Sequence, residues 1–363
     1  VELELDPAEP ANRSIHVRGA GGRIPVSGGA DAGSALALHV GNAGTAARFL
    51  AALVCLGRGT YRLSGVPRMH ERPQAELFTA LRSLGYRVDA TGDRLPAVIH
   101  GGGPRPGRVR VTAASSSQFA SALLLGAEAG GWEVAVDGGD TEELPYVEMT
   151  RRMAGVFPRD GGVFRVEPDA SSGSYFWAAD HLFAGGVARG SCVAVRGWPV
   201  TGWQIDEAFP RFLPLPRLLS RNTDLGDSIL TAMVLAPFGS EPVRFVDLGR
   251  LRVQECERVA AMRTELGKCG VRVEEEGDSL TIHPAAHPRG AEIETYGDHR
   301  IAMCFAVFGL RVPGVRLRDP GCVRKTFPNY FAKLAAPVPG GLGVRILDSR
   351  TGRGLAGADL LAD

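Results

Sequence analysis

VAAMRTELGKCGVRVEEEGDSLTI, residues 259–282, changes its hydrophobic period half-way along. The apolar residues that share one helical face in its first half are Val259, Met262, Leu266 and Cys269. Gly270 follows, where helices commonly end, and apolar and polar residues then alternate on both sides of a Glu276-Gly277-Asp278 turn. This change of period predicts a helix, a glycine cap and a hairpin of two strands.

The same change from a helical to a strand pattern occurs elsewhere in the chain. Residues Pro73–Leu84 are followed by Gly85 and a predicted strand at Tyr86–Val88. A third copy has a helical pattern from Tyr146 through Met153 to Gly155, and a predicted strand at Val163–Val166. Repeats of this kind predict βαβ-type units stacked around a common centre, an α/β architecture.

One further unit departs from the pattern, and so do both ends. Residues Ile205–Leu219 begin like a helix that Pro210, Pro214 and Pro216 interrupt. Residues Val1–Leu5 alternate as a strand with no helix before them, so we expect that an N-terminal segment is missing. The length of 363 residues suits two domains, which we expect at 1–164 and 165–335 (the second with one shortened unit), with 336–363 an appended tail.

The composition is that of a soluble globular protein, with 44% apolar and 22% charged residues. The net charge of +1 favours neither nucleic acid nor an anionic membrane as a partner. Apolar runs such as Ile301–Leu310 are too short to span a bilayer. The six cysteines have no metal-ligand spacing, so we expect free thiols, no metal and a cytoplasmic setting.

Four predicted helices begin after a polar or glycine-rich turn. These turns are Gly41–Thr45, Ser115–Gln118, Asp224–Asp227 and Asp298–Arg300. A helix N-terminus offers unpaired N–H groups and the positive end of the helix dipole, so each turn is a candidate anion site. Ordinary capping by the same residue types is the alternative explanation.

Basic and acidic residues stand in or near these turns. The candidate cations are Arg68, Arg72, Arg252, Arg258, Arg300, Arg324 and Lys325. Arginine binds carboxylate and phosphate with two parallel hydrogen bonds, although any single arginine can equally be a solvated surface charge. Asp227, Glu255 and Asp298 lie in the same segments and are candidate proton carriers.

Several of these segments, taken together, resemble the signatures of the 5-enolpyruvylshikimate-3-phosphate synthase family. They are Gly41–Arg48, Arg68–Pro73, Ser116–Phe119, Asp169–Ser172, Glu255–Arg258, Asp298–Met303 and Lys325–Pro328, in the family's order and up to about Leu334. The resemblance implies an inverse α/β barrel of two domains built from βαβαββ units, which close on ligands between them. It also implies enolpyruvyl transfer from phosphoenolpyruvate to the 5-hydroxyl of shikimate 3-phosphate, with release of phosphate, by a monomer without a cofactor.

The resemblance assigns roles to individual residues. The positions that match phosphoenolpyruvate-binding residues are Gly44, Arg72, Gln118, Arg258, Arg300 and Lys325. The acceptor site would comprise Ser116, Ser117, Gln118, Glu143, Asp227, Arg250 and Gln254. Asp227 matches the carboxylate that takes the proton from the acceptor hydroxyl, and Glu255 matches the one that protonates the methylene carbon.

The match fails in places that concern the acceptor. The family's Gly-x-Lys-Ser motif and the following Asn-Arg have no counterpart. Glu143 and Leu144 stand where the family has Ser and usually Lys or Arg, Arg250 replaces Asn, and Gln254 replaces Lys. Counting formal charge at Glu143, Arg250 and Gln254, the acceptor pocket is expected to be less cationic by one unit, unless the alignment slips by one residue near Pro145.

Three other functions stay open on the sequence. One is transfer to a different hydroxyl acceptor in secondary metabolism, and another is an inactive ligand-binding paralogue or fragment. The related UDP-N-acetylglucosamine enolpyruvyl transferase fits less well, because the segment Arg68–Pro73 contains no cysteine.

Overall fold

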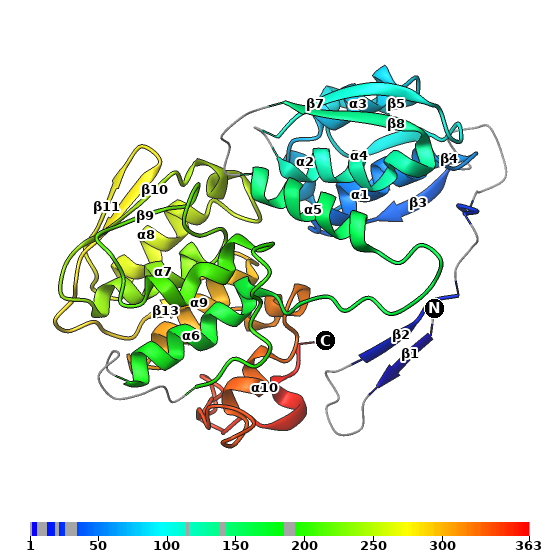
Figure 1. The fold of residues 1–363 in the computed structure, drawn as a ribbon. Coiled ribbons are helices and arrows are strands. Elements are labelled where there is room, and N and C mark those ends of the chain that lie inside the picture. The colour runs from blue at the N-terminus through cyan, green and yellow to red at the C-terminus, as the bar shows by residue number, and fades with distance from the viewer. Residues whose placement is uncertain are drawn as a thin grey trace. The chain divides into compact units, whose positions relative to one another are not determined.

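The computed structural model describes residues 2–5, 13–18, 22–25, 35–113, 116–137, 143–184 and 193–362. The chain forms two compact units, residues 17–165 and residues 166–363 together with 1–16 (Figure 1). The mixture of helices and sheets in both units confirms the α/β prediction.

A sheet of four strands lies in the unit of residues 17–165. Its order is β3 (Leu36–His39), β4 (Thr60–Ser64), β6 (Ala97–His100) and β5 (Arg87–Ala90). The pair β3–β4 is parallel, whereas β6 is antiparallel to both of its neighbours. A second, parallel pair consists of β7 (Gly107–Thr112) and β8 (Trp132–Asp137).

Helices pack against these strands. They are α1 (Gly44–Cys55), α2 (Pro67–Glu71), α3 (Ala75–Ser83), α4 (Ser117–Gly130) and α5 (Leu144–Val156), with the short 3-10 turn η2 (Thr91–Asp93). Helix α4 contacts α1, α5 and β8, so it lies at the centre of the unit. Its Phe119 and Leu123 are fully buried in the same core as Ala47 of α1. This packing fixes the N-termini of α1 and α4, which carry the candidate anion sites.

The other unit also has a sheet of four strands. Its order is β11 (Val273–Glu276), β12 (Ser279–Ile282), β10 (Val243–Val246) and β9 (Leu218–Ser220). Only the pair β9–β10 is parallel in this sheet. Two further pairs are β13 (Glu292–Ile293) with β14 (Arg316–Leu317), which are parallel, and β1 (Glu2–Leu5) with β2 (Arg13–His16), which are antiparallel.

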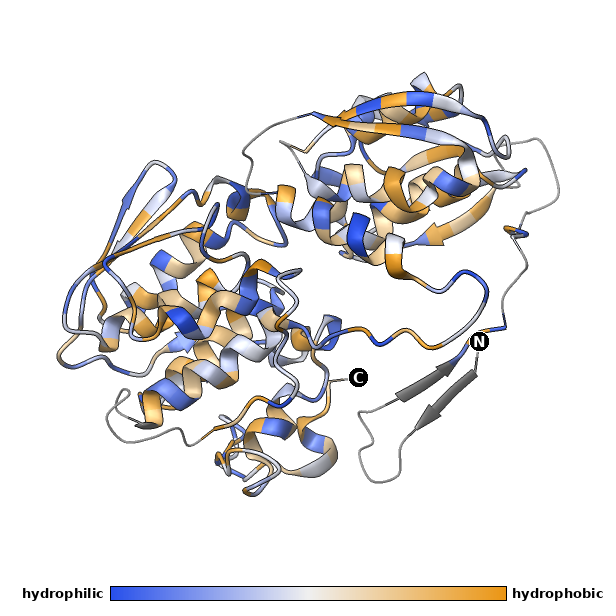
Figure 2. Cartoon of the chain, in the orientation of Figure 1, coloured by the Kyte–Doolittle hydropathy of each residue, from blue (hydrophilic) through white to orange (hydrophobic). Residues whose placement is uncertain are grey.

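The α-helices of this unit are α6 (Ala170–Ala184), α7 (Ile229–Leu235), α8 (Arg258–Lys268), α9 (His299–Gly309) and α10 (Tyr330–Ala335). Its 3-10 segments are η4 (Ile205–Phe212), η5 (Ala236–Phe238), η6 (Gly249–Val253), η7 (Pro320–Lys325) and η8 (Gly357–Leu360). Helix α7 packs between α6 and α9, and each of its residues is buried. Figure 2 accordingly shows these packed helices largely in apolar colours.

The predicted helix, glycine and hairpin are confirmed as α8–β11–β12, and the predicted helix, glycine and single strand are confirmed as α3–β5, where β6 adds a second strand that the pattern did not predict. Both linking glycines have positive φ, +85° at Gly85 and +80° at Gly270, which an L side chain rarely adopts. The third copy is only half confirmed. Helix α5 forms, but the strand predicted at Val163–Val166 is wrong, because these residues have no strand partner in the described chain and Val163 is 87% exposed.

Both ends of the chain group with residues 166–363. We expected 1–16 to belong to the first domain and 336–363 to be an appended tail. Leu360 is instead buried in the core of this unit, with Leu342, Val344 and Ile346 packed against that core. The C-terminal residues therefore contribute to the stability of this unit.

Two general features of the described residues bear on function. None of their helices is both long enough and apolar enough to cross a membrane. Among the described cysteines, Cys55, Cys269 and Cys304 are buried free thiols, while Cys256 and Cys322 are free and partly buried. Cys192 lies outside the described residues.

Candidate active site

A cationic site lies at the start of α1, in the unit of residues 17–165. Helix α1 begins at Gly44, and no side chain caps it. A Cβ atom added to Gly44 would lie 2.7 Å from Nη2 of Arg72 and 3.0 Å from Oε1 of Gln118. Only glycine leaves room for these two side chains to converge on the helix N-terminus. Three of the residues predicted to bind phosphoenolpyruvate therefore lie together.

A second arginine, Arg48, stabilises this arrangement through buried contacts. Arg48 is buried, and it donates to the carbonyl oxygens of Pro73 (2.7 Å) and Gly44 (3.3 Å). Its guanidinium lies 5.9 Å from the centre of the Phe119 ring. Arg72 is also buried and donates to the carbonyl oxygen of Asn42 at 3.1 Å. Arg48 thus links α1 to the segment that carries Arg72.

The start of α4 brings together four predicted acceptor residues. Ser116 caps the helix, its Oγ accepting from the backbone N–H of Gln118 at 3.3 Å. The carboxylate of Glu143, only 4% exposed, accepts from the backbone N–H of Ser117 at 2.8 Å and from its hydroxyl at 2.6 Å. Gln118 donates to Oγ1 of Thr45 at 3.5 Å, so it joins the start of α4 to the start of α1.

In the unit of residues 166–363, three arginines surround Asp227. Its carboxylate lies 3.0 Å from Nε of Arg300, 3.4 Å from Nη2 of Arg221 and 3.7 Å from Nη1 of Arg258. Ser228, and not Asp227, is the N-cap of α7. The carboxylate of Asp227 is therefore occupied by cations rather than by helix capping.

Arg258 connects this group to Asp298 and Glu255. Asp298 is fully buried and caps α9, accepting from the backbone N–H of Arg300 at 2.9 Å. The same carboxylate accepts two hydrogen bonds from Arg258, from Nε at 2.7 Å and from Nη2 at 3.2 Å. Glu255 accepts from Nη2 of Arg258 at 2.9 Å and also from the ammonium of Lys325. The predicted residues Asp227, Glu255, Arg258, Arg300 and Lys325 thus form one network.

These contacts determine the charge states in the network. Burial alone would raise the pKa of Asp227, but Arg300, Arg258 and Arg221 hold that pKa well below its usual value. Burial also opposes the ionisation of Asp298, but the charge and hydrogen bonds of Arg258 outweigh burial, so the pKa of Asp298 is lowered. Burial, with the nearby charge of Arg300, lowers the pKa of His299 to about 3. His299 is therefore neutral at physiological pH, and both aspartates are ionised.

Sequence reasoning missed two buried residues, Arg221 in this network and Asp206 next to it. Arg221 follows β9 and is 1% exposed beside Asp227. Asp206, in η4, is 2% exposed and accepts from the backbone N–H groups of Gly226 (2.7 Å) and Ser228 (3.3 Å). It also accepts from the hydroxyls of Ser228 and Ser171, and thereby ties the starts of α6 and α7 together. Asp206 is 20 or more residues away in sequence from the groups that it contacts, and Arg221, six residues before Asp227, lies outside the motifs singled out in the sequence.

Other predicted residues have different surroundings. Gln254 accepts from Nη1 of Arg258, and Arg250 lies half-buried in η6. Arg252 binds Glu257, Glu275 and Asp278 at 2.7–2.8 Å, which makes it a structural link and not a ligand residue. Arg68 pairs with Glu71 at 2.7 Å on the surface, and Arg324 is exposed. Among the described residues, no group of His, Cys, Asp and Glu could hold a metal ion.

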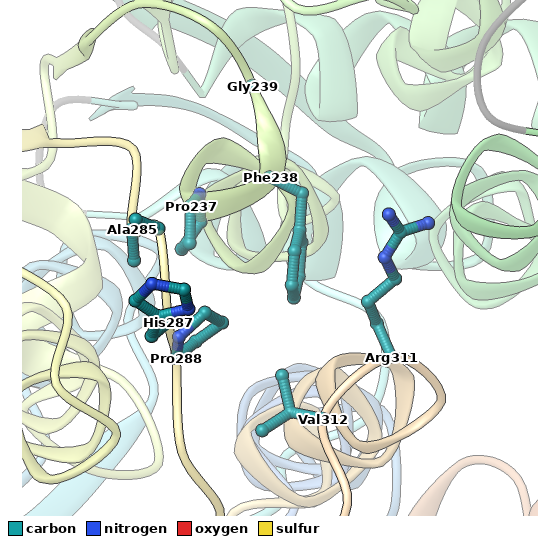
Figure 3. Close-up of a pocket in the computed structure, with 9 residues that line it drawn as sticks. Pro237, Phe238, Gly239, Ala285, His287, Pro288, Arg311 and Val312 are labelled. Carbon is teal, nitrogen blue, oxygen red and sulfur yellow. The ribbon is translucent and has the colours of Figure 1, made fainter.

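A hollow of about 400 Å³ lies elsewhere in the same unit. Figure 3 shows Phe238 and Val312 facing it, with Arg311 at one side. Arg311 and Val312 follow the C-terminal end of α9, whereas Asp298 and Arg300 stand at its N-terminal end. Eleven helical residues rise by roughly 16 Å, so this hollow is separate from the charged network.

The described geometry agrees with the sequence relationships of the chain. The family model of EPSP synthase (3-phosphoshikimate 1-carboxyvinyltransferase) matches residues 12–158 and 222–334. The chain belongs to the EPSP synthase family.

In relatives of this family, more than a third of the aligned residues are identical to those of the chain. The 3-phosphoshikimate 1-carboxyvinyltransferase of Trichormus variabilis is 37% identical over 89% of this chain and 82% of its own length. That of Bordetella petrii is 38% identical over 93% of this chain and 85% of its own length. The family match omits residues 159–221, which contain η4 and hence Asp206.

Solved structures support the same fold. The EPSP synthase of Acinetobacter baumannii superimposes with a TM-score of 0.56 at 20% identity, over 83% of this chain and 78% of that chain. The enolpyruvyl transferase NikO of Streptomyces tendae gives a TM-score of 0.51 at 16% identity, over 76% of this chain and 71% of that one. The predicted enolpyruvyl-transferase fold is confirmed.

Proposed function

We propose that this chain transfers the enolpyruvyl group of phosphoenolpyruvate to an acceptor hydroxyl and releases phosphate. The observation that carries the proposal is the network of Arg258, Arg300 and Lys325 with Asp227 and Glu255. A ligand with both a carboxylate and a phosphate needs several cations at once, and this network supplies them. Membership of the EPSP synthase family supports the 5-hydroxyl of shikimate 3-phosphate as the acceptor.

Each unit has its own candidate groups for binding an anionic part of phosphoenolpyruvate. In one unit, Arg258, Arg300 and Lys325 would bind its anionic groups. The other unit has a separate group, in which Arg72 and Gln118 converge on Gly44 and the uncapped N-terminus of α1 adds a positive dipole that favours an anion. Such fixed charges also stabilise the charge that develops during the reaction.

The two carboxylates are proposed as proton carriers. Glu255, protonated, would deliver a proton to the methylene carbon, which leaves C2 electrophilic. The acceptor oxygen then bonds to C2 while Asp227 takes the hydroxyl proton. The resulting tetrahedral adduct loses phosphate, and one proton of its new methyl group returns to Glu255, which restores the carbon–carbon double bond and the protonated carboxyl. No redox partner enters this sequence.

The low pKa of Asp227 bears directly on its proposed role. A carboxylate that three arginines stabilise is a weak base. Phosphoenolpyruvate would bring its own anionic groups to Arg300 and Arg258, and so withdraw part of that stabilisation. We infer that substrate binding raises the basicity of Asp227 at the step that requires it.

The assignment of Arg300 is tested by titration calorimetry with phosphoenolpyruvate. Arg300→Ala removes a charge-assisted contact worth about 1.5–3 kcal/mol, so we expect affinity to fall by roughly ten- to a hundredfold. The control is Arg263→Ala, which removes the same charge from a half-exposed residue of α8 that pairs with Glu275. Equal affinities in wild type and Arg300→Ala would remove Arg300 from the site.

A second candidate function is transfer to a different acceptor. The observation that favours it is the buried carboxylate of Glu143 at Ser117, within the proposed acceptor site. Phosphate release with shikimate 3-phosphate, compared with other hydroxyl compounds, separates the two candidates.

A further inference from the structure

An internal carboxylate occupies the N-terminus of α4. Glu143 stands immediately before α5, but its side chain makes no cap for α5. It reaches instead to Ser117, 26 residues earlier, and accepts from both the N–H and the hydroxyl of that residue. The Ser117 N–H belongs to the first turn of α4, where backbone donors have no partner within the helix.

The position of Glu143 is fixed by the packing of α4 on α5. Val147, one turn further along α5, is 1% exposed in the core of the unit. The hydroxyls of Ser121 in α4 and Thr150 in α5 are hydrogen-bonded at 2.7 Å. Glu143 itself is 4% exposed. The carboxylate is therefore held at the helix terminus by its surroundings and is not a surface group that lies there by chance.

The N-terminus of α4 lies next to the cationic site at the start of α1. Gln118, the residue after Ser117, contacts Thr45 at 3.5 Å and lies over Gly44 beside Arg72. A ligand bound over Gly44 would consequently have α4 as its neighbour. An anionic group of such a ligand would seek the donors of Ser117, but Glu143 already uses them and would repel a second anion.

We propose that Glu143 determines acceptor specificity by excluding a phosphate from the N-terminus of α4. The group that an acceptor presents at this point is a hydrogen-bond donor, a hydroxyl or an ammonium, which the carboxylate can accept. This inference rests on the proposed function, because it concerns the acceptor of that same reaction.

The experiment compares shikimate with shikimate 3-phosphate, which differ only by the phosphate. Both ligands are titrated calorimetrically into wild type and into Glu143→Gln. The phosphate advantage of each protein is the dissociation constant of shikimate divided by that of shikimate 3-phosphate. The Gln side chain keeps an oxygen for Ser117 but removes the charge. We expect the phosphate advantage to be at least about tenfold larger in Glu143→Gln.

Glu148→Gln is the matched control. It removes the same charge from an exposed residue of α5, the helix that Glu143 precedes, which pairs with Arg152 at 3.0 Å, and it should leave the phosphate advantage as in wild type. If Glu143→Gln does not give a cooperative thermal transition, Glu143→Ser takes its place with the same expectation.

The outcomes separate this inference from the proposed function. A phosphate advantage that differs by less than about threefold between wild type and Glu143→Gln overturns the inference, and so does the absence of shikimate 3-phosphate binding in both proteins. Phosphoenolpyruvate titration is run on the same samples. If it shows no binding to any of them, the proposed function is contradicted, while the acceptor comparison still stands.

Discussion

Asp227 illustrates how the residues of a binding site act on one another before a ligand arrives. Its carboxylate is the internal counter-ion of Arg300, Arg221 and Arg258. Substrate anions must therefore compete with Asp227 for two arginines that are proposed to bind phosphoenolpyruvate. The same residue would be a base in the reaction and a competitor of the substrate in binding.

The substitution Asp227→Asn separates these two effects. We expect phosphoenolpyruvate to bind about tenfold more tightly, because the arginines lose a competing anion. Turnover should fall by ~10²–10⁴-fold, because the amide cannot accept the hydroxyl proton. Calorimetry and a phosphate-release assay measure the two quantities. The control is Asp224→Asn, which changes a carboxylate that accepts a hydrogen bond from the backbone N–H of Ser220. Full activity in a folded Asp227→Asn protein would exclude Asp227 as the base.

His299 makes the stability of its unit depend on pH. Its pKa is about 3 in the folded chain and roughly 6.5 when unfolded, so between these values only the unfolded chain binds the proton. Stability then rises with pH by up to about 1.4 kcal/mol per unit over this window. Denaturant unfolding from pH 4 to 7 should show a shallower slope in His299→Gln. Equal slopes in both proteins would contradict the buried neutral state of His299.

The aspartates Asp227 and Asp298 determine how the stability changes at lower pH. Asp227 and Asp298 have lowered pKa values, so their stabilising contribution is present above the ordinary aspartate pKa of about 3.9 and is lost as pH falls below it. His299→Gln should keep this loss below pH 4, which provides an internal control for the measurement.

At the scale of elements, the sequence predicted what depends on local periodicity. The helix, glycine and strand at Ala75–Ala90 and the helix, glycine and hairpin at Arg258–Ile282 follow from the period of the apolar residues and from one glycine at a fixed place. The strand predicted at Val163–Val166 needed a partner strand, which local alternation cannot supply. Most of the candidate site residues came from family motifs, whereas Asp206 depends on contacts between distant segments and Arg221 lies outside the motifs.

Asp206 joins secondary-structure elements of this unit to one another. It lies in the broken helix η4 and binds the starts of α6 and α7, so one carboxylate fixes the turn that carries Asp227. Asp206→Ala would leave several buried donors without an acceptor. We expect a loss of about 2–4 kcal/mol in unfolding free energy, measured by urea denaturation.

Two comparisons make the Asp206 result specific. Burial raises the pKa of Asp206, so the neutral Asp206→Asn should cost less than Asp206→Ala. Arg211→Ala changes an exposed residue of the same 3-10 segment and should have little effect. A loss in Asp206→Ala no larger than that in Arg211→Ala would mean that the capping contacts contribute little.

At the scale of the whole molecule, the balance of charge within the network matters for encounter with the substrate. Arg221, Arg258, Arg300 and Lys325 face Asp227, Glu255 and Asp298, which leaves a sum of +1. The entire chain also carries +1. A nearly neutral cluster has a weak field beyond the Debye length, about 10 Å at 0.1 M salt.

The pairing of arginines with carboxylates therefore has a kinetic consequence. An approaching anion is attracted only at short range, and its capture depends on diffusion and on exchange of ion partners inside the site. We expect the association rate of phosphoenolpyruvate, measured by stopped-flow fluorescence, to change by less than about threefold between 50 and 500 mM salt. Asp227→Asn adds one positive charge and should make this rate faster and more sensitive to salt. The internal carboxylates thus trade long-range attraction of the substrate for selectivity at the moment of contact.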